Sequence, residues 1–221
     1  MIEPHVLPPL TEEQRLALID CFKNNTMLQQ YPGRAFALDL IPALEIIKPI
    51  IDSVLGVGTW DVTGGNFFET STGYRVHADT GKEGPNRVLQ TFVFPLSMEL
   101  DPTKEFQPEK NRLVILNQTW TGDAAFFLRG SPDEPNEYNI VVKDYADVIG
   151  LVPGAKDPIL YDLCPHLNSE NFLGLTVDKT FQWTPGIPMT FPRNRLHLST
   201  AFPRRGIKKK LGLSIFTSKK Q

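Results

Sequence analysis

The first 55 residues have the apolar spacing of amphipathic helices. Residues 11–14 read Thr-Glu-Glu-Gln, a capping-box sequence in which the Thr11 hydroxyl and the Gln14 side chain satisfy free backbone amides at a helix start. Apolar positions 16, 18, 19 and 22 follow as one stripe. A second helical pattern opens at Pro42 and ends at Gly56, and Pro49 within it predicts a kink or two short helices. We therefore expect residues 1–58 to form a helical N-terminal part.

After Gly58 the pattern changes to short apolar runs rich in β-branched and aromatic residues and bounded by Gly, Pro or Asn, which predicts strands. Helices followed by many short strands favour a mainly β (α+β) fold, a jelly-roll-like sandwich with the helices packed on one sheet. The expected strands are Arg87–Leu96, Arg112–Leu116, Ala124–Leu128, Pro188–Phe191, Leu196–Phe202 and Leu211–Thr217.

A polar, proline-containing stretch interrupts this strand pattern at residues 129–180. A structureless loop of that length is uncommon inside a compact domain, so we expect an insertion or lid with short elements of its own. The 221 residues are of a size for one domain, 1–221, with a sizeable core.

Composition points to a globular chain, with 41% hydrophobic and 22% charged residues. No apolar run has the length of a membrane-spanning helix, and the N-terminus lacks the pattern of a secretory signal. Cys21 and Cys164 are too few to staple a chain of this size and are typical of a reducing compartment. We expect a cytoplasmic protein without membrane contact.

The charge distribution is asymmetric, although the formal net charge is only −2. No acidic residue follows Asp178, whereas lysine and arginine recur to the C-terminus. This segregation suggests that an anion is met near the C-terminal end.

Two histidines stand in sequences that could bind a metal. In Gly73–Asp79, alternate side chains of a strand share a face, so His77 and Asp79 would point the same way, about 7 Å apart at Cα. His197 lies in a second expected strand, followed by a run of basic residues at 204–210. Two histidines and one carboxylate on one face leave open coordination positions, as in non-haem Fe(II) oxygenases. His166, in the insertion, is a competing candidate for the distal ligand.

These pieces resemble, in order and spacing, the Fe(II)/2-oxoglutarate-dependent dioxygenases, in particular their prolyl-hydroxylase-like branch. The resembling segments are TGYRVHAD at Thr72–Asp79, Arg87 at the start of a strand, PGIPMTFPRNRLHLSTAF at Pro185–Phe202 and KLGLSIF at Lys210–Phe216. The resemblance implies a double-stranded β-helix, Fe(II) and O2 as cofactors, and 2-oxoglutarate as a co-substrate that is decarboxylated to succinate.

Carried over residue by residue, the resemblance implies that His77, Asp79 and His197 bind the iron. Lys210 falls where the family commonly has an arginine for the C5 carboxylate of 2-oxoglutarate, and lysine offers a point charge instead of a bidentate fork. Further co-substrate candidates are Arg195, which shares the strand parity of His197, then Arg204 and Arg205, and Thr91, on a strand that often supplies a hydroxyl. For Arg195, a salt bridge at the rim of the site is an equal alternative.

The substrate side is less defined. Tyr74, Arg75 and Trp120 are the candidate substrate-binding residues, although Tyr74 could equally be core and tryptophans such as Trp120 are more often core. The tyrosine that prolyl hydroxylases use is absent, and Phe94 and Pro95 occupy its region. Asp79 favours hydroxylation, because related halogenases lack this carboxylate. We expect a small-molecule or peptidyl substrate.

Two rival functions remain open at this level. One is a cupin-like metal protein that does not use 2-oxoglutarate, although such proteins typically draw on more clustered histidines. The other is a nucleic-acid-binding or nucleic-acid-acting relative using the basic C-terminal stretch, which lacks the interleaved stacking aromatics expected of such a site.

Overall fold

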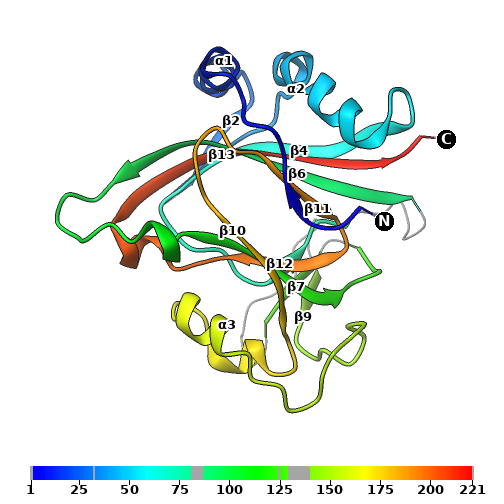
Figure 1. The fold of residues 1–221 in the computed structure, drawn as a ribbon, viewed down its shortest axis with the longest axis vertical. Coiled ribbons are helices and arrows are strands. Elements are labelled where there is room, and N and C mark those ends of the chain that lie inside the picture. Colours follow the sequence, from blue (N-terminus) through cyan, green and yellow to red (C-terminus); the bar gives the residue numbers. More distant parts are fainter. Residues whose placement is uncertain (1, 32, 81–86, 124, 129–139, 221) are drawn as a thin grey trace.

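The computed structural model describes residues 2–31, 33–80, 87–123, 125–128 and 140–220. Figure 1 shows two layers of strands, with α1 and α2 covering one layer and α3 beneath the other. The predicted mainly β architecture, with helices packed on one sheet, is confirmed.

The N-terminal segment contains a short strand β1 (His5–Val6) and two helices, α1 (Glu12–Lys23) and α2 (Ile41–Leu55). The capping box predicted at Thr11 is present, since the Gln14 amide donates to Thr11 Oγ1 at 3.1 Å and the Thr11 amide to Gln14 Oε1 at 2.9 Å. Helix α2 continues through Pro49 instead of dividing into two. The helical prediction is wrong for the segment between the helices, which forms the hairpin β2 (Leu28–Tyr31) and β3 (Arg34–Ala37).

The larger sheet has seven strands in the order β1-β11-β6-β13-β4-β3-β2. Its new members are β4 (Trp60–Thr70), β6 (Val88–Leu100), β11 (Met189–Pro192) and β13 (Ile207–Lys219). The smaller sheet has six strands in the order β10-β7-β12-β5-β8-β9. They are β5 (His77–Ala78), β7 (Arg112–Thr119), β8 (Ala125–Phe127), β9 (Ile140–Val142), β10 (Val177–Gln182) and β12 (Arg195–Ser199).

The described part of the expected insertion, residues 140–180, contains short elements. These are β9, helix α3 (Pro158–Leu163), a 3-10 turn η2 (Ser169–Phe172) and the start of β10. Two further 3-10 turns are η1 (Pro108–Lys110) and η3 (Phe202–Arg205). Residues 129–139 lie outside the described part of the chain. No helix in that part is long and apolar enough to cross a membrane.

Three apolar clusters hold the layers together. The first joins α1 and α2 to the outer face of the larger sheet through residues such as Leu18, Ile47 and Phe94. The second joins α3 and its neighbours to the outer face of the smaller sheet. The third, which includes Trp183 and Phe191, lies between the two sheets. Because alternate residues of a strand point to opposite faces, this division fixes which side chains point into the space between the sheets.

Candidate metal centre

Strand alternation directs two histidines into the space between the sheets. His77 follows Val76, which belongs to the outer cluster of the smaller sheet, and His197 lies between Leu196 and Leu198 of the same cluster. The two histidines therefore point to the opposite, inner face. Strands β5 and β12 pair antiparallel with His77 directly opposite His197, so both imidazoles lie side by side.

The side chains of His77, Asp79 and His197 converge on one point, with their candidate ligand atoms all within 4.8 Å of one another. His77 Nε2 lies 3.7 Å from Asp79 Oδ1, and His197 Nε2 lies 3.3 Å from Asp79 Oδ2. All three side chains are at most 15% exposed. Two nitrogen donors and one carboxylate in this arrangement are suited to a divalent transition metal with open coordination positions.

Backbone carbonyls orient both imidazoles in the same way. His77 Nδ1 lies 2.9 Å from the carbonyl oxygen of Arg75, and His197 Nδ1 lies 3.0 Å from that of Arg195. A carbonyl can only accept, so each Nδ1 carries the proton and donates. Each Nε2 lone pair is thereby directed toward Asp79, the tautomer and orientation that metal-binding histidines require.

Asp79 is fixed through both its side chain and its backbone. The Thr91 hydroxyl, fully buried on β6, donates to Asp79 Oδ2 at 2.8 Å. The Arg193 guanidinium donates to the Asp79 carbonyl oxygen from Nε at 3.0 Å and from Nη2 at 2.7 Å. Arg193 Nη1 also donates to Thr63 Oγ1 at 2.8 Å and to the Thr217 carbonyl at 3.1 Å. This arginine therefore ties the turn that carries Asp79 to β4 and β13.

The charge states suit metal binding. Burial, and then the neighbouring His197, lower the pKa of His77 to about 3, so this imidazole is neutral near pH 7. Burial opposes ionisation of Asp79, but His197, His77 and the Thr91 hydroxyl outweigh it and hold the pKa of Asp79 at about 2. The site thus presents a carboxylate and a deprotonated imidazole nitrogen without competition from protons.

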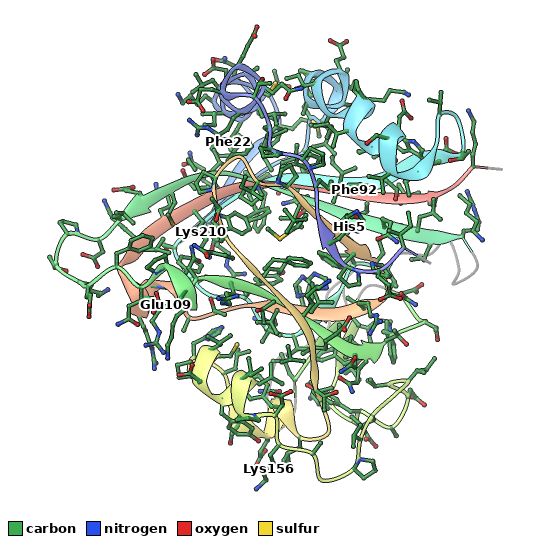
Figure 2. The ribbon with its side chains drawn as sticks, in the orientation of Figure 1. His5, Phe22, Phe92, Glu109, Lys156 and Lys210 are labelled. Atoms are coloured by element: carbon green, nitrogen blue, oxygen red, sulfur yellow. The ribbon has the colours of Figure 1, made fainter. Side chains whose placement is uncertain are left out.

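Lys210 is a buried amine between the sheets, as Figure 2 shows. Its neighbours Leu211 and Leu213 belong to the outer cluster, so Lys210 points inward, and it is only 2% exposed. Its Nζ lies 4.1 Å from the Phe202 ring centroid and 4.9 Å from that of Trp183. Nζ makes no hydrogen bond or ion pair with any described residue, and burial lowers the pKa of Lys210 well below its usual value.

Apolar side chains lie between this amine and the triad. Trp183 and Phe191 belong to the same inner cluster, and the Phe191 ring lies 4.7 Å from the His197 ring. Gly212 makes room for Trp183, because a Cβ atom at this position would lie 2.7 Å from the indole.

The candidate substrate residues are placed differently from one another. The Tyr74 ring contacts the His77 ring edge-on at 4.6 Å, and the Arg75 guanidinium lies 5.0 Å from the ring centroid of Phe126, the residue opposite His77. Both thus lie beside the triad. Trp120 instead packs on Phe127 of the outer cluster, and its indole donates to the Asp123 carbonyl at 2.7 Å.

The structure does not bring the other candidate cations into contact with the triad. Arg195 donates to the Asn117 carbonyl at 2.8 Å and lies 3.7 Å from Asp178, because a register irregularity between residues 195 and 197 separates its direction from that of His197. Arg205 donates to Gln107 Oε1 at 3.1 Å. His166 is not part of the His77–Asp79–His197 cluster.

Sequence reasoning did not assign Arg193 a role. In the sequence, Arg193 is one of many basic residues after Asp178, two positions before Arg195, and nothing in the pattern distinguishes it from the others. That the side chain is 2% exposed and bound to the Asp79 backbone is visible only once β11, β4 and β13 are assembled.

Comparisons with known proteins support the fold. No family model matches the sequence, and no curated protein matches it. Among solved structures, an oxidoreductase of the 2OG-Fe(II) oxygenase family from Burkholderia pseudomallei aligns over 97% of this chain and 84% of its own, with 9% identity and a TM-score of 0.51. HygX from Streptomyces hygroscopicus, with nickel, 2-oxoglutarate and hygromycin B bound, aligns over 97% and 82%, with 10% identity and a TM-score of 0.53.

A third solved structure, the non-heme alpha ketoglutarate dependent epimerase SnoN from nogalamycin biosynthesis, aligns over 97% of this chain and 76% of its own, with 10% identity and a TM-score of 0.53. Identities this low establish the fold and not the reaction. The chain has the double-stranded β-helix fold of the Fe(II)/2-oxoglutarate oxygenases and carries a His-Asp-His cluster between its two sheets.

Proposed function

We propose that this protein is an Fe(II)- and 2-oxoglutarate-dependent dioxygenase that hydroxylates an unactivated C–H bond of a small molecule or of an amino-acid or peptidyl substrate. The observation that carries the proposal is the convergence of His77, Asp79 and His197, each held by a second residue, on one buried point. Bound there with 2-oxoglutarate and O2, Fe(II) would supply the oxidising chemistry, with succinate and CO2 as co-products.

The chain's own residues would bind and orient the co-substrate. Lys210 would pair with its far carboxylate, since the amine is buried without an anionic partner among the described residues. An ammonium–carboxylate pair in a water-poor pocket is a strong, charge-assisted contact. Trp183 and Phe202 would exclude water from that contact. Thr91 would keep Asp79 in its ligating orientation.

Asp79 supports hydroxylation over halogenation as the outcome, because related halogenases lack this carboxylate. Epimerisation is the main competing outcome, since one of the solved structures of this fold is an epimerase. The two differ in the mass of the organic product: hydroxylation adds one oxygen atom, whereas epimerisation leaves the mass unchanged.

The experiment is succinate formation from 2-oxoglutarate in air with Fe(II), measured by mass spectrometry with and without a small-molecule and peptide panel. We expect succinate from the wild type, none with Asp79→Ala, and unchanged formation with His5→Ala. His5 is the matched control because it lies on β1, bound to the Glu3 carbonyl. Succinate at the same rate from Asp79→Ala, or none from the wild type across the panel, would contradict the proposal.

A further inference from the structure

A basic pocket opens beside the candidate metal centre. It has a volume of about 500 Å³, and the charged or titratable residues that line it are Arg34, Arg75, Arg204 and His166. Every other described residue of the lining is neutral. Its size is in the range of pockets that bind small molecules.

The basic residues come from four separate parts of the fold. Arg34 lies on β3 of the larger sheet, Arg75 precedes β5 of the smaller sheet, Arg204 lies in η3 and His166 follows α3. The pocket therefore bridges the two sheets. Cationic side chains gathered in one pocket repel one another, and a bound anion would offset this repulsion.

Two of these arginines have no anionic partner within the described chain. Arg34 donates to the Thr72 hydroxyl from Nε and Nη2, both at 3.2 Å, and its guanidinium lies 5.0 Å from the Tyr74 ring centroid. Neither Arg34 nor Arg204 forms an ion pair with a described residue. Thr72 and Tyr74 hold the Arg34 fork in place while its charge remains uncompensated, which is the condition under which arginine binds carboxylate or phosphate most effectively.

His166 adds a buried polar group to the same pocket. Both of its ring nitrogens are shielded from solvent, and neither makes a hydrogen bond of ordinary geometry within the described chain. Gly73 permits this position, because a Cβ atom there would lie 2.6 Å from His166 Nε2. Burial lowers the pKa of His166, more than the Tyr74 backbone raises it, so the ring stays neutral and retains one N–H donor.

The pocket lies within the reach of one small molecule from the metal centre. The Tyr74 ring contacts His77 on one side, at 4.6 Å, and Arg34 on another, at 5.0 Å. In the larger sheet, Arg34 is opposite Thr70 and Thr70 is opposite Lys210, so Arg34 and Lys210 share the inner face two strands apart. Two strand spacings are roughly 10 Å. A substrate held in the pocket could therefore place a C–H bond near the triad beside a co-substrate bound at Lys210.

We propose that this pocket binds an anionic oxygen group, a carboxylate or a phosphate, of the primary substrate, with Arg34 and Arg204 as its principal contacts. The assignment rests on the proposed dioxygenase function for its biological meaning, but anion binding itself needs neither metal nor turnover. The substrate class that follows is a small acidic molecule or an acidic peptide side chain.

The test is a titration of the full chain, without added metal, with inorganic phosphate, acetate and neutral acetamide, followed by NMR or calorimetry. The variants are Arg34→Gln/Arg204→Gln in the pocket and Arg15→Gln as control. Arg15→Gln removes one arginine charge on helix α1, where Arg15 pairs with Glu12 at 2.6 Å. Circular dichroism of each variant verifies that it is folded.

We expect at least one of the two anions to bind the wild type and Arg15→Gln alike, and to bind the double pocket variant at least tenfold more weakly, the scale of one lost charge-assisted contact. Phosphate alone or acetate alone would identify the anionic group. Equal binding to the wild type and the double variant, no binding of either anion, or equal binding of acetamide would overturn the proposal. Because the anion titration uses metal-free protein, its outcome does not depend on dioxygenase activity. A negative anion titration would leave the proposed dioxygenase function untouched, and a negative succinate test would leave a measured anion site in place.

Discussion

The substitution Lys210→Met isolates the charge of the buried amine. Methionine has a similar length and no charge, so it fills the space beside Trp183 and Phe202 while removing the group we assign to the far carboxylate of 2-oxoglutarate. The adjacent Lys209 provides a matched control, because it lies on the other face of β13 and pairs with Glu69 at 3.0 Å.

The magnitude follows from the surroundings of the amine. A hydrogen bond to a charged group contributes about 1.5–3 kcal/mol, and the lack of any competing partner for Nζ among the described residues favours the upper half of that range. Each 1.4 kcal/mol is about tenfold in affinity, so the apparent 2-oxoglutarate requirement should rise roughly 40- to 140-fold.

The assay is succinate formation against 2-oxoglutarate concentration, supported by calorimetric titration of 2-oxoglutarate into metal-loaded protein. We expect Lys210→Met to raise both the 2-oxoglutarate concentration needed for succinate formation and the dissociation constant of 2-oxoglutarate, and Lys209→Met to change neither. An unchanged 2-oxoglutarate requirement in a folded Lys210→Met protein would refute the assignment and transfer the role to another cation.

Four further predictions test the surroundings of the site. Burial depresses the pKa of Lys210 in the folded state, so between that pKa and about 10.4 the unfolded chain binds more protons than the folded chain. The stability of the co-substrate-free wild type should therefore rise with pH in that interval. Thermal melts should show that Lys210→Met flattens this rise. His197→Ala should weaken Mn(II) binding by more than about 100-fold in calorimetry, whereas His5→Ala should leave it unchanged, and equal affinities would remove His197 from the ligand set. Arg193→Met removes the donors that the carbonyl oxygens of Asp79 and Thr217 now have, which should lower the free energy of unfolding by roughly 3 kcal/mol in urea titrations. It should also weaken metal binding. An unchanged urea midpoint would show that other donors can replace these hydrogen bonds. Burial raises the pKa of Cys164 to about 12, so its thiol should resist alkylation at neutral pH until the protein unfolds. Rapid labelling of Cys164 in the native protein would contradict the packing described for α3.

The sequence predicted side-chain orientation correctly where the alternation of polar and apolar residues along a strand is enough to fix it. His77 and His197 lie in strands with apolar neighbours on the other face, so their inward orientation follows from alternation alone. The same holds for Lys210, followed by Leu211 and Leu213. These are the positions at which strand periodicity and burial agree.

The elements that were missed depend on pairing between distant segments. Strand β4 has Gly64 and Gly65 in its middle, which reads as a break, yet the strand continues because β13 pairs along it. Gly65 has a φ of +145°, and a Cβ atom there would overlap the Ser214 carbonyl, so only glycine allows the close approach. The hairpin β2–β3 likewise forms against β4.

Strand parity alone could not give the side-chain direction where the register is irregular. Arg195 and His197 have the same strand parity, but the irregularity between them turns the arginine toward Asp178 and Glu3. The basic pocket could not be predicted from the sequence either, because Arg34 and Arg204 are 170 positions apart. Only the folded chain places both in the lining of one pocket.

The most direct test of the central claim is the metal dependence of 2-oxoglutarate binding, measured anaerobically by calorimetry with Mn(II) in place of Fe(II). The account predicts that 2-oxoglutarate binds the metal-loaded wild type, that binding is lost without metal or with His77→Ala, and that Lys210→Met weakens it at least tenfold. Binding of equal strength to the wild type and His77→Ala, or no binding to the metal-loaded wild type, would contradict it.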